Sequence, residues 1–285
     1  MHPVNERYQD VGPEEFYGLC ASLARKSILR TMFAADEREL DGHFKVYAVF
    51  SVPGDDLFDI LVMRLKDAGH GLSYRSITPA VPAAHWYERE IRDMFGITPE
   101  GHPDDRPLVL HGMYEKGLYP LRRDVTAETV RQAVDIGRED FYRYMEMKGE
   151  GVYEIPVGPV HAGIIEPGHF RFSAVGETIY YLDPRLFFKH KGIEKLFERM
   201  GFEAGVALSE RVSGVSSFSH STAYCLAVER MAGIEAPSRA KAARTLLMEL
   251  ERLYNHIGDI GNMCAGTGLA VGYARGAVLK ETLMA

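Results

Sequence analysis

The residues with the most potential for chemistry lie in one turn of the second half of the chain, residues 166–171. A proline and a glycine impose a sharp bend there, and the bend brings together the carboxylate of Glu166, the imidazole of His169 and the guanidinium of Arg171. A neighbouring cation and partial burial can bring the pKa values of a carboxyl group and an imidazole towards neutrality, so this turn could move protons. A structural turn held by salt bridges explains the same residues equally well, and both interpretations stay open.

A second stretch has the spacing of a metal site without its ligands. Ser213 and Ser216 are separated by two residues and precede a predicted helix. A serine hydroxyl stays protonated near neutral pH, whereas nickel and iron need a soft, anionic thiolate. We therefore expect no metal at these serines. We interpret Ser219–Thr222 as a helix N-terminus whose hydroxyls cap free backbone amides.

The remaining metal-ligating residue types are scattered along the chain. His161, His190 and His220 do not have ligand spacing, and lone histidines are more often structural, so we predict no histidine metal site. The three cysteines lie far apart in apolar or helical contexts and are expected to be small buried thiols rather than a disulfide framework.

Charged residues also gather beside the single tryptophan, Trp86. Glu88, Arg89 and Glu90 follow it, and they could form a binding face. A solvated helix face, with Glu88 and Arg92 paired at i,i+4, explains them more simply, and we prefer that interpretation.

Composition and charge exclude several classes of protein. Lys and Arg total 33 against 40 Asp and Glu, a formal net charge of −7, and neither sign forms a long block, so a nucleic-acid-binding surface is not expected. No apolar run approaches the roughly 20 residues of a membrane-spanning helix, and the N-terminus lacks the apolar core of a signal peptide. We predict a soluble, cytoplasmic chain.

The fold class expected from the order of elements is α+β, in two domains. Residues 1–125 form the first, a small, mostly antiparallel sheet with helices on one face. Its expected elements are a helix that opens at Pro13, strands at 30–35, 44–52 and 58–65, and a helix at 83–95 that ends at Gly96. Residues 44, 46, 48, 50 and 52 should share the apolar face of their strand. Prolines between 98 and 107 predict a loop without strand pairing.

Residues 126–154 are charged and weakly helical, and we assign them to the connection between the domains. The second domain, residues 155–285, should begin as a small sheet with a hairpin, 169–175 and 178–182, and continue as a helical bundle with helices at 193–200, 222–231 and 238–260. The chain stops within a helical pattern, so we expect it to be a truncated fragment.

These motifs carry a resemblance to known families. The run from Trp86 to Ile97, followed by Gly101-His102-Pro103, closely resembles the signature of the 30-kDa subunit of respiratory complex I. The second domain resembles the N-terminal part of the 49-kDa complex I subunit and of the large subunit of membrane-bound, energy-converting (group 4) nickel–iron hydrogenases. The residues that support it are 158–161, 166–172, 190–195 and 211–229, and the phrase GPVHAGIIEPGHFRF favours the hydrogenase side.

The resemblance implies a large hydrophilic subunit of an oxidoreductase complex. Its partners would be a small iron–sulfur subunit, a ferredoxin-like subunit and membrane proton-pumping subunits, on the inner face of the cell membrane. Electrons from the partner's iron–sulfur cluster would be coupled to proton movement. By this resemblance Glu166 and His169 are the protonic groups, Arg171 is their electrostatic partner, and His161 lines the site. Gly214 and His220 are the expected cofactor-facing positions.

The sequence also departs from these families. The hydrogenase pattern Arg-x-Cys-Gly-x-Cys reads Arg211-Val212-Ser213-Gly214-Val215-Ser216 here, so both metal-binding thiolates are replaced by serine. We therefore expect no cofactor bound by this chain itself. The prediction that a quinone binds at an interface is weakened, because Gly214 stands where complex I has the tyrosine that holds the quinone headgroup. An NADH:quinone oxidoreductase subunit and a non-catalytic scaffold that docks the cluster subunit remain the alternatives. No glycine-rich dinucleotide fingerprint is present, so direct NADH binding is not expected.

Overall fold

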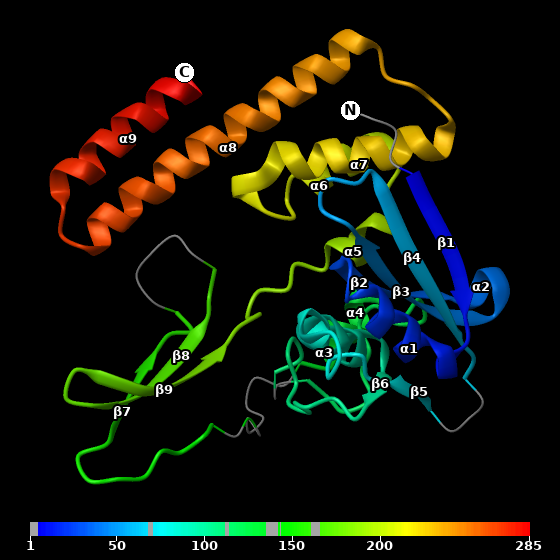
Figure 1. Cartoon of the computed structure of the whole chain (residues 1–285), viewed down its shortest axis with the longest axis horizontal. Helices are drawn as coiled ribbons and strands as arrows, with labels where there is room; N and C mark the ends of the chain where they lie inside the picture. Colours follow the sequence, from blue (N-terminus) through cyan, green and yellow to red (C-terminus); the bar gives the residue numbers. More distant parts are fainter. Residues whose placement is uncertain (1–4, 68–70, 112–113, 135–141, 143, 161–165) are drawn as a thin grey trace. The chain divides into compact units, whose positions relative to one another are not determined.

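A computed structural model describes residues 5–67, 71–111, 114–134, 142, 144–160 and 166–285. The chain consists of two compact units. Residues 2–190 form the first unit and residues 191–285 the second, and Figure 1 labels the elements of both. The predicted boundaries of the two family modules, near residues 125 and 155, remain predictions.

The first unit is built on a four-stranded sheet in the order β1-β4-β3-β2. Its strands are β1 (Asn5–Val11), β2 (Ile28–Glu37), β3 (His43–Ser51) and β4 (Leu57–Leu65). The pairs β2–β3 and β3–β4 are antiparallel, whereas β1 lies parallel to β4, so the mostly antiparallel sheet expected from the sequence is confirmed. Strand β1 was not predicted, since its residues are polar and mostly exposed.

The core lies on one face of this sheet. The alternating residues of β3 from Phe44 to Phe50 are buried, and they pack in one apolar cluster with α1 (Pro13–Leu23) and α3 (His85–Phe95). Figure 1 shows these two helices beside the sheet. The prediction for Val52 is wrong: it lies beyond the strand, before a turn, and is 40% exposed.

Helix α3 follows a short 3-10 turn, η1 (Pro82–Ala84), and ends where the sequence predicts. Gly96 adopts a left-handed φ of 70°, and its amide donates to the carbonyl of Arg92. A Cβ atom at this position would collide with the ring of Tyr119, so glycine is required both by the backbone conformation and by the close packing.

The region after α3 differs from the predicted loop. Residues Ile97–Glu100 form β6, which pairs in parallel with β5 (Leu72–Arg75) in a separate two-stranded sheet. Pro99 is tolerated because each strand of a two-stranded sheet is an edge strand. The short helix α4 (Ala127–Gln132) follows later in the chain, whereas the other short helix, α2 (Arg38–Asp41), connects β2 and β3.

A three-stranded antiparallel sheet ends the first unit. It consists of β7 (Tyr153–Val157), β8 (His169–Val175) and β9 (Thr178–Arg185) in the order β7-β8-β9. The predicted hairpin is confirmed, and Gly176 in its turn has a positive φ of 58°.

The second unit is helical. It contains α5 (Ile193–Phe197), α6 (Phe202–Ser209), η2 (Gly214–Ser216), α7 (Ser217–Ala232), α8 (Ser238–Gly266) and α9 (Ala270–Met284). Helices α8 and α9 pack closely where Gly261 faces Gly276, since a Cβ on either would touch the other's backbone. Among the described residues, no helix has both the length and the apolar character needed to cross a membrane.

Glu88 corrects the predicted solvated face of α3. It is fully buried, and its carboxylate accepts hydrogen bonds from the hydroxyl of Ser76 at 2.6 Å, the amide of Ile77 at 2.8 Å, and the amide and hydroxyl of Thr78. Burial and the nearby charge of Glu88 raise the pKa of the Cys20 thiol to about 12. Arg89 is also buried, whereas Trp86 is 50% exposed. The charged side chains of Glu88 and Arg89 therefore lie inside the fold, and the tryptophan lies at its surface.

Replacement of Glu88 by alanine should lower the free energy of unfolding by about 3 kcal/mol, because it leaves several buried donors without an acceptor. Chemical denaturation of the full chain measures this loss. Glu15→Gln, at an exposed position on α1, is the control and should have little effect. Equal stability of the two variants would show that the buried network contributes little.

Candidate functional site

His169 is the buried imidazole of the predicted turn. It begins β8, is 7% exposed, and its Nδ1 lies 3.1 Å from the carbonyl oxygen of Gly158. A carbonyl oxygen accepts hydrogen bonds, so Nδ1 carries the proton in this contact. Nε2 is buried and has no hydrogen-bond partner among the residues that the structure describes. The ring is therefore oriented through one nitrogen and leaves the other available for a proton.

Arg171 lies on the same face of β8, two residues further on. Its Nη1 is 3.2 Å from the carboxylate of Glu154 on β7, and its guanidinium lies 4.0 Å from the ring centre of Tyr144. The Tyr144 ring also contacts the His169 ring, with centroids 5.3 Å apart. Tyr144 thus connects the two side chains, and the ion-pair partner of Arg171 that this geometry identifies is Glu154.

Two further residues extend this polar face onto β9. Asp183 is opposite Arg171 in the strand register and Arg185 is opposite His169, and both are buried. Asp183 accepts a hydrogen bond from the hydroxyl of Tyr142 at 3.0 Å. Burial, and then this contact, raise the pKa of Tyr142 to about 12, so its hydroxyl keeps its proton at neutral pH.

Asp104 and Arg106 join this face to α3. Asp104 lies 3.1 Å from Arg89 and 2.8 Å from Arg106, and Arg106 reaches Asp183 at 3.5 Å. Burial alone would raise the pKa of Asp104, but the hydrogen bonds from Arg106 and the charge of Arg89 outweigh it and hold that pKa well below its usual range.

A cavity of about 210 Å³ lies along this network. Its lining includes Arg89, Arg106 and Arg185, whose charges already have partners: Arg185 Nε donates to Nδ1 of buried His111, and the Nη2 of Arg89 donates to the Pro107 carbonyl. These contacts link the cavity lining to the segment between β6 and α4.

The structure does not assemble all the predicted catalytic residues. Glu166 is exposed, three residues before the buried His169. His161 lies outside the described residues. The roles predicted for both remain predictions.

The second predicted stretch, Arg211–Ser216, forms a turn that we call the serine turn. It begins at the second residue after α6 and includes η2. Within it, the amide of Ser216 donates a hydrogen bond to the carbonyl of Ser213 at 3.1 Å. Lys191 Nζ donates to the carbonyl of Val212 at 2.9 Å. A Cβ atom at Gly214 would have no atom within 4 Å, so there is open space next to the backbone there.

The predicted capping of α7 is wrong. The helix begins at Ser217, before the expected Ser219, and its serine hydroxyls donate to carbonyls: Ser217 to Gly214 and Ser221 to Phe218. The first amides instead bind the carboxylate of Glu251 on α8. His220 is half-buried in the first turn of α7.

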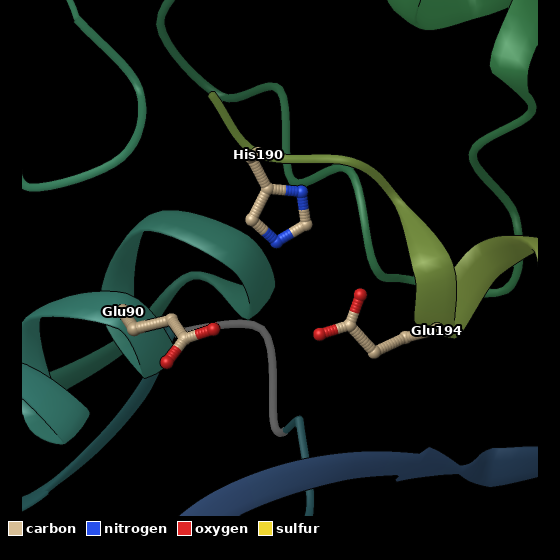
Figure 2. A group of neighbouring side chains, drawn as sticks. All are labelled: Glu90, His190 and Glu194. Atoms are coloured by element: carbon tan, nitrogen blue, oxygen red, sulfur yellow. The ribbon is translucent and has the colours of Figure 1, made fainter. Parts of the chain in front are cut away.

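The serine turn does not fit a nickel–iron centre. The side chains at the two ligand positions carry the neutral hydroxyls of Ser213 and Ser216, which cannot replace two metal-binding thiolates. Figure 2 shows another group of metal-ligating side chains, Glu90, His190 and Glu194. Glu90 and His190 belong to the first unit and Glu194 to the second, so they do not define a metal site of either unit.

Sequence reasoning missed most of the residues that support these sites. His111, Asp183, Arg185 and Glu251 are buried and Asp104 is half-buried, and each is hydrogen-bonded or ion-paired to a residue distant in the chain. One available signal was the alternation of the predicted strand that contains Asp183 and Arg185. The alternation places these two charged residues on the same face, which in a simple surface strand would be exposed to water.

Comparison with known proteins agrees with the sequence motifs. Residues 10–131 match the family described as respiratory-chain NADH dehydrogenase, 30 Kd subunit. The predicted resemblance of this first part of the chain to the complex I 30-kDa subunit is therefore confirmed. The resemblance to a fused, two-module subunit is also confirmed by the relatives of the chain.

Formate hydrogenlyase subunit 5 and hydrogenase-4 component G, both from Escherichia coli (strain K12), are each 42% identical to the chain over 257 residues. These alignments cover 90% of the chain and 45% and 46% of the two relatives. The C/D fusion protein of NADH-quinone oxidoreductase from Photorhabdus laumondii is 33% identical, over 71% of the chain and 37% of that protein. The chain thus spans about half the length, or less, of these relatives.

Asp104→Asn should remove about 3 kcal/mol of stability, because it leaves buried Arg89 and half-buried Arg106 without their shared carboxylate. The pKa of Asp104 is lowered in the folded state, so its contribution is complete above the ordinary pKa near 4 and is lost as the pH falls further towards the lowered value. Denaturation of the wild type and the variant between pH 7 and pH 3 measures both effects.

The difference in stability between wild type and Asp104→Asn should shrink as the pH falls below about 4. Asp105→Asn, at the exposed neighbouring position, is the matched control and should follow the wild type. A difference that stays constant down to pH 3 would contradict the assigned role of the carboxylate charge.

Proposed function

We propose that the chain acts as a large hydrophilic subunit of a complex I-like, hydrogenase-related membrane oxidoreductase. In this proposal electrons arrive from an iron–sulfur cluster of a partner subunit, and the chain couples their transfer to proton movement. The partners are a small iron–sulfur subunit, a ferredoxin-like subunit and membrane proton-pumping subunits, on the inner face of the cell membrane. The family of residues 10–131 and the hydrogenase subunits among the relatives support this assignment.

The observation that carries the proton-transfer part is the geometry of His169. Its Nδ1 is anchored on the Gly158 carbonyl, while its buried Nε2 lacks a partner among the described residues. Such a ring can take up a proton at Nε2 and release it without losing its orientation. Arg171 and Tyr144 hold the surrounding face, and Glu166 is the exposed carboxylate that would exchange protons with solvent.

The proposal includes no nickel–iron chemistry in the serine turn, because hydroxyls replace the thiolates that such a centre needs. Gly214 and His220 remain the proposed positions that face an electron acceptor brought by the assembled complex. A quinone at an interface is the acceptor that the NADH-quinone oxidoreductase relatives suggest.

His169→Asn is the sharpest test in the assembled complex. The asparagine amide can still donate to the Gly158 carbonyl, but the variant has no equivalent of Nε2. We expect coupled electron transfer to fall about 100-fold, the scale of general acid–base catalysis. Glu166→Gln should reduce it in the same direction, whereas Glu177→Gln, in the exposed hairpin turn, is the control and should not. Undiminished electron transfer and proton pumping in both site variants would favour the scaffold function.

Metal analysis tests the serine turn separately. Purified chain, and the complex that contains it, should hold no stoichiometric nickel attributable to this subunit, since neutral hydroxyls bind nickel weakly. Elemental analysis by mass spectrometry measures the nickel-to-protein ratio. One nickel per chain that persists after dialysis against a chelator would contradict the proposal.

A further inference from the structure

Glu251 is a buried carboxylate in the second unit that the proposed function does not use. It lies in the middle of α8 and is 4% exposed. Its two oxygens accept from the amide of Phe218 at 2.7 Å, and from the amide and hydroxyl of Ser219 at 3.0 and 2.5 Å. Burial of an ionised carboxylate is costly unless such donors compensate it, and here all three donors come from the first turn of α7.

Asn255 provides a second attachment one helical turn further along α8. Its side-chain amide donates to the carbonyl of Val215 at 2.5 Å, and its spacing of four residues from Glu251 places both side chains on one face of the helix. The two contacts lie on either side of Ser216. The contact of Asn255 fixes a carbonyl of the serine turn, and the contacts of Glu251 fix the backbone amides that follow the turn.

The serine turn supplies no side-chain cap for the first amides of α7. The residue before α7, Ser216, makes no side-chain cap, and the hydroxyls of Ser217 and Ser221 bind carbonyls rather than amides. Glu251 therefore serves as the cap of α7, supplied from a helix more than thirty residues away.

We propose that Glu251, assisted by Asn255, is the positioning residue of the serine turn and of the N-terminus of α7. This inference rests on the proposed function, in which Gly214 and His220 face the electron acceptor. The carboxylate also occupies the electropositive end of α7, where an anionic ligand would otherwise bind. The acceptor group that meets the turn at this end should accordingly be uncharged, as a quinone headgroup is, rather than a carboxylate or a phosphate.

Hydrogen–deuterium exchange of the full chain tests the positioning directly. Glu251→Ala should raise the exchange rate in peptides that cover residues 211–222 by about tenfold or more, because the two amides lose their acceptor. Glu251→Gln should lie between the wild type and the alanine variant, since its one carbonyl oxygen can still accept. Asn255→Ala should raise exchange in the same peptides. Amides of β2, β3 and β4 should exchange as in the wild type in all three variants.

Glu249→Gln is the matched control, because Glu249 lies two residues earlier on α8, is exposed and pairs with exposed Arg252. It should leave exchange at residues 211–222 unchanged. The positioning role is overturned if Glu251→Ala and Glu251→Gln both exchange like this control. If Glu251→Ala does not fold, the comparison of Glu251→Gln and Asn255→Ala with the control decides the question in the same way.

A second readout separates this inference from the proposed function. In the assembled complex, Glu251→Gln should lower kcat per folded complex about tenfold and leave the melting temperature of the first unit unchanged, as expected for a displaced site. Faster exchange with unchanged kcat would support the positioning of the turn and contradict the proposed function of Gly214 and His220. Unchanged exchange would overturn the positioning role, whatever happens to kcat.

Discussion

The first unit depends on a chain of alternating charges, Arg89–Asp104–Arg106–Asp183, that runs from helix α3 to strand β9. Arg89 and Asp183 are buried and the two members between them are half-buried, so the opposite charges compensate one another where water is largely excluded. This chain links the residues of the complex I 30-kDa family with the three-stranded sheet that follows them. One face of that sheet carries His169 and Arg171 and is therefore charged. Ion pairs compensate its charges, so this face can be buried instead of being exposed to water.

Buried carboxylates accept hydrogen bonds from backbone amides at several places in the described part of the molecule. Glu88 holds the segment before α3, Asp93 accepts from the amides of Leu108, Val109 and Leu110, and Glu251 holds the start of α7. In each case a carboxylate supplies the acceptor that an irregular segment lacks, so segments without regular secondary structure remain ordered. Glu88 and Asp93 on α3 therefore have a structural role, and their presence does not indicate a catalytic site.

The two places at which chemistry is proposed, His169 and the serine turn, are each held by contacts with other residues. His169 is held by a backbone carbonyl and an aromatic neighbour, and the serine turn is held by Lys191, Asn255 and Glu251.

The sequence by itself determined the α+β class, the strands and helices with strong hydrophobic periodicity, the hairpin at Gly176 and the family resemblance. It also determined the absence of thiolates at Ser213 and Ser216, because that depends on residue type alone. It did not determine the burial of Glu88, the cap on α7, or the partner of Arg171. Those depend on contacts between residues far apart in the chain, such as Ser219 with Glu251, and a local pattern of charges looks the same whether water or a distant backbone amide satisfies it.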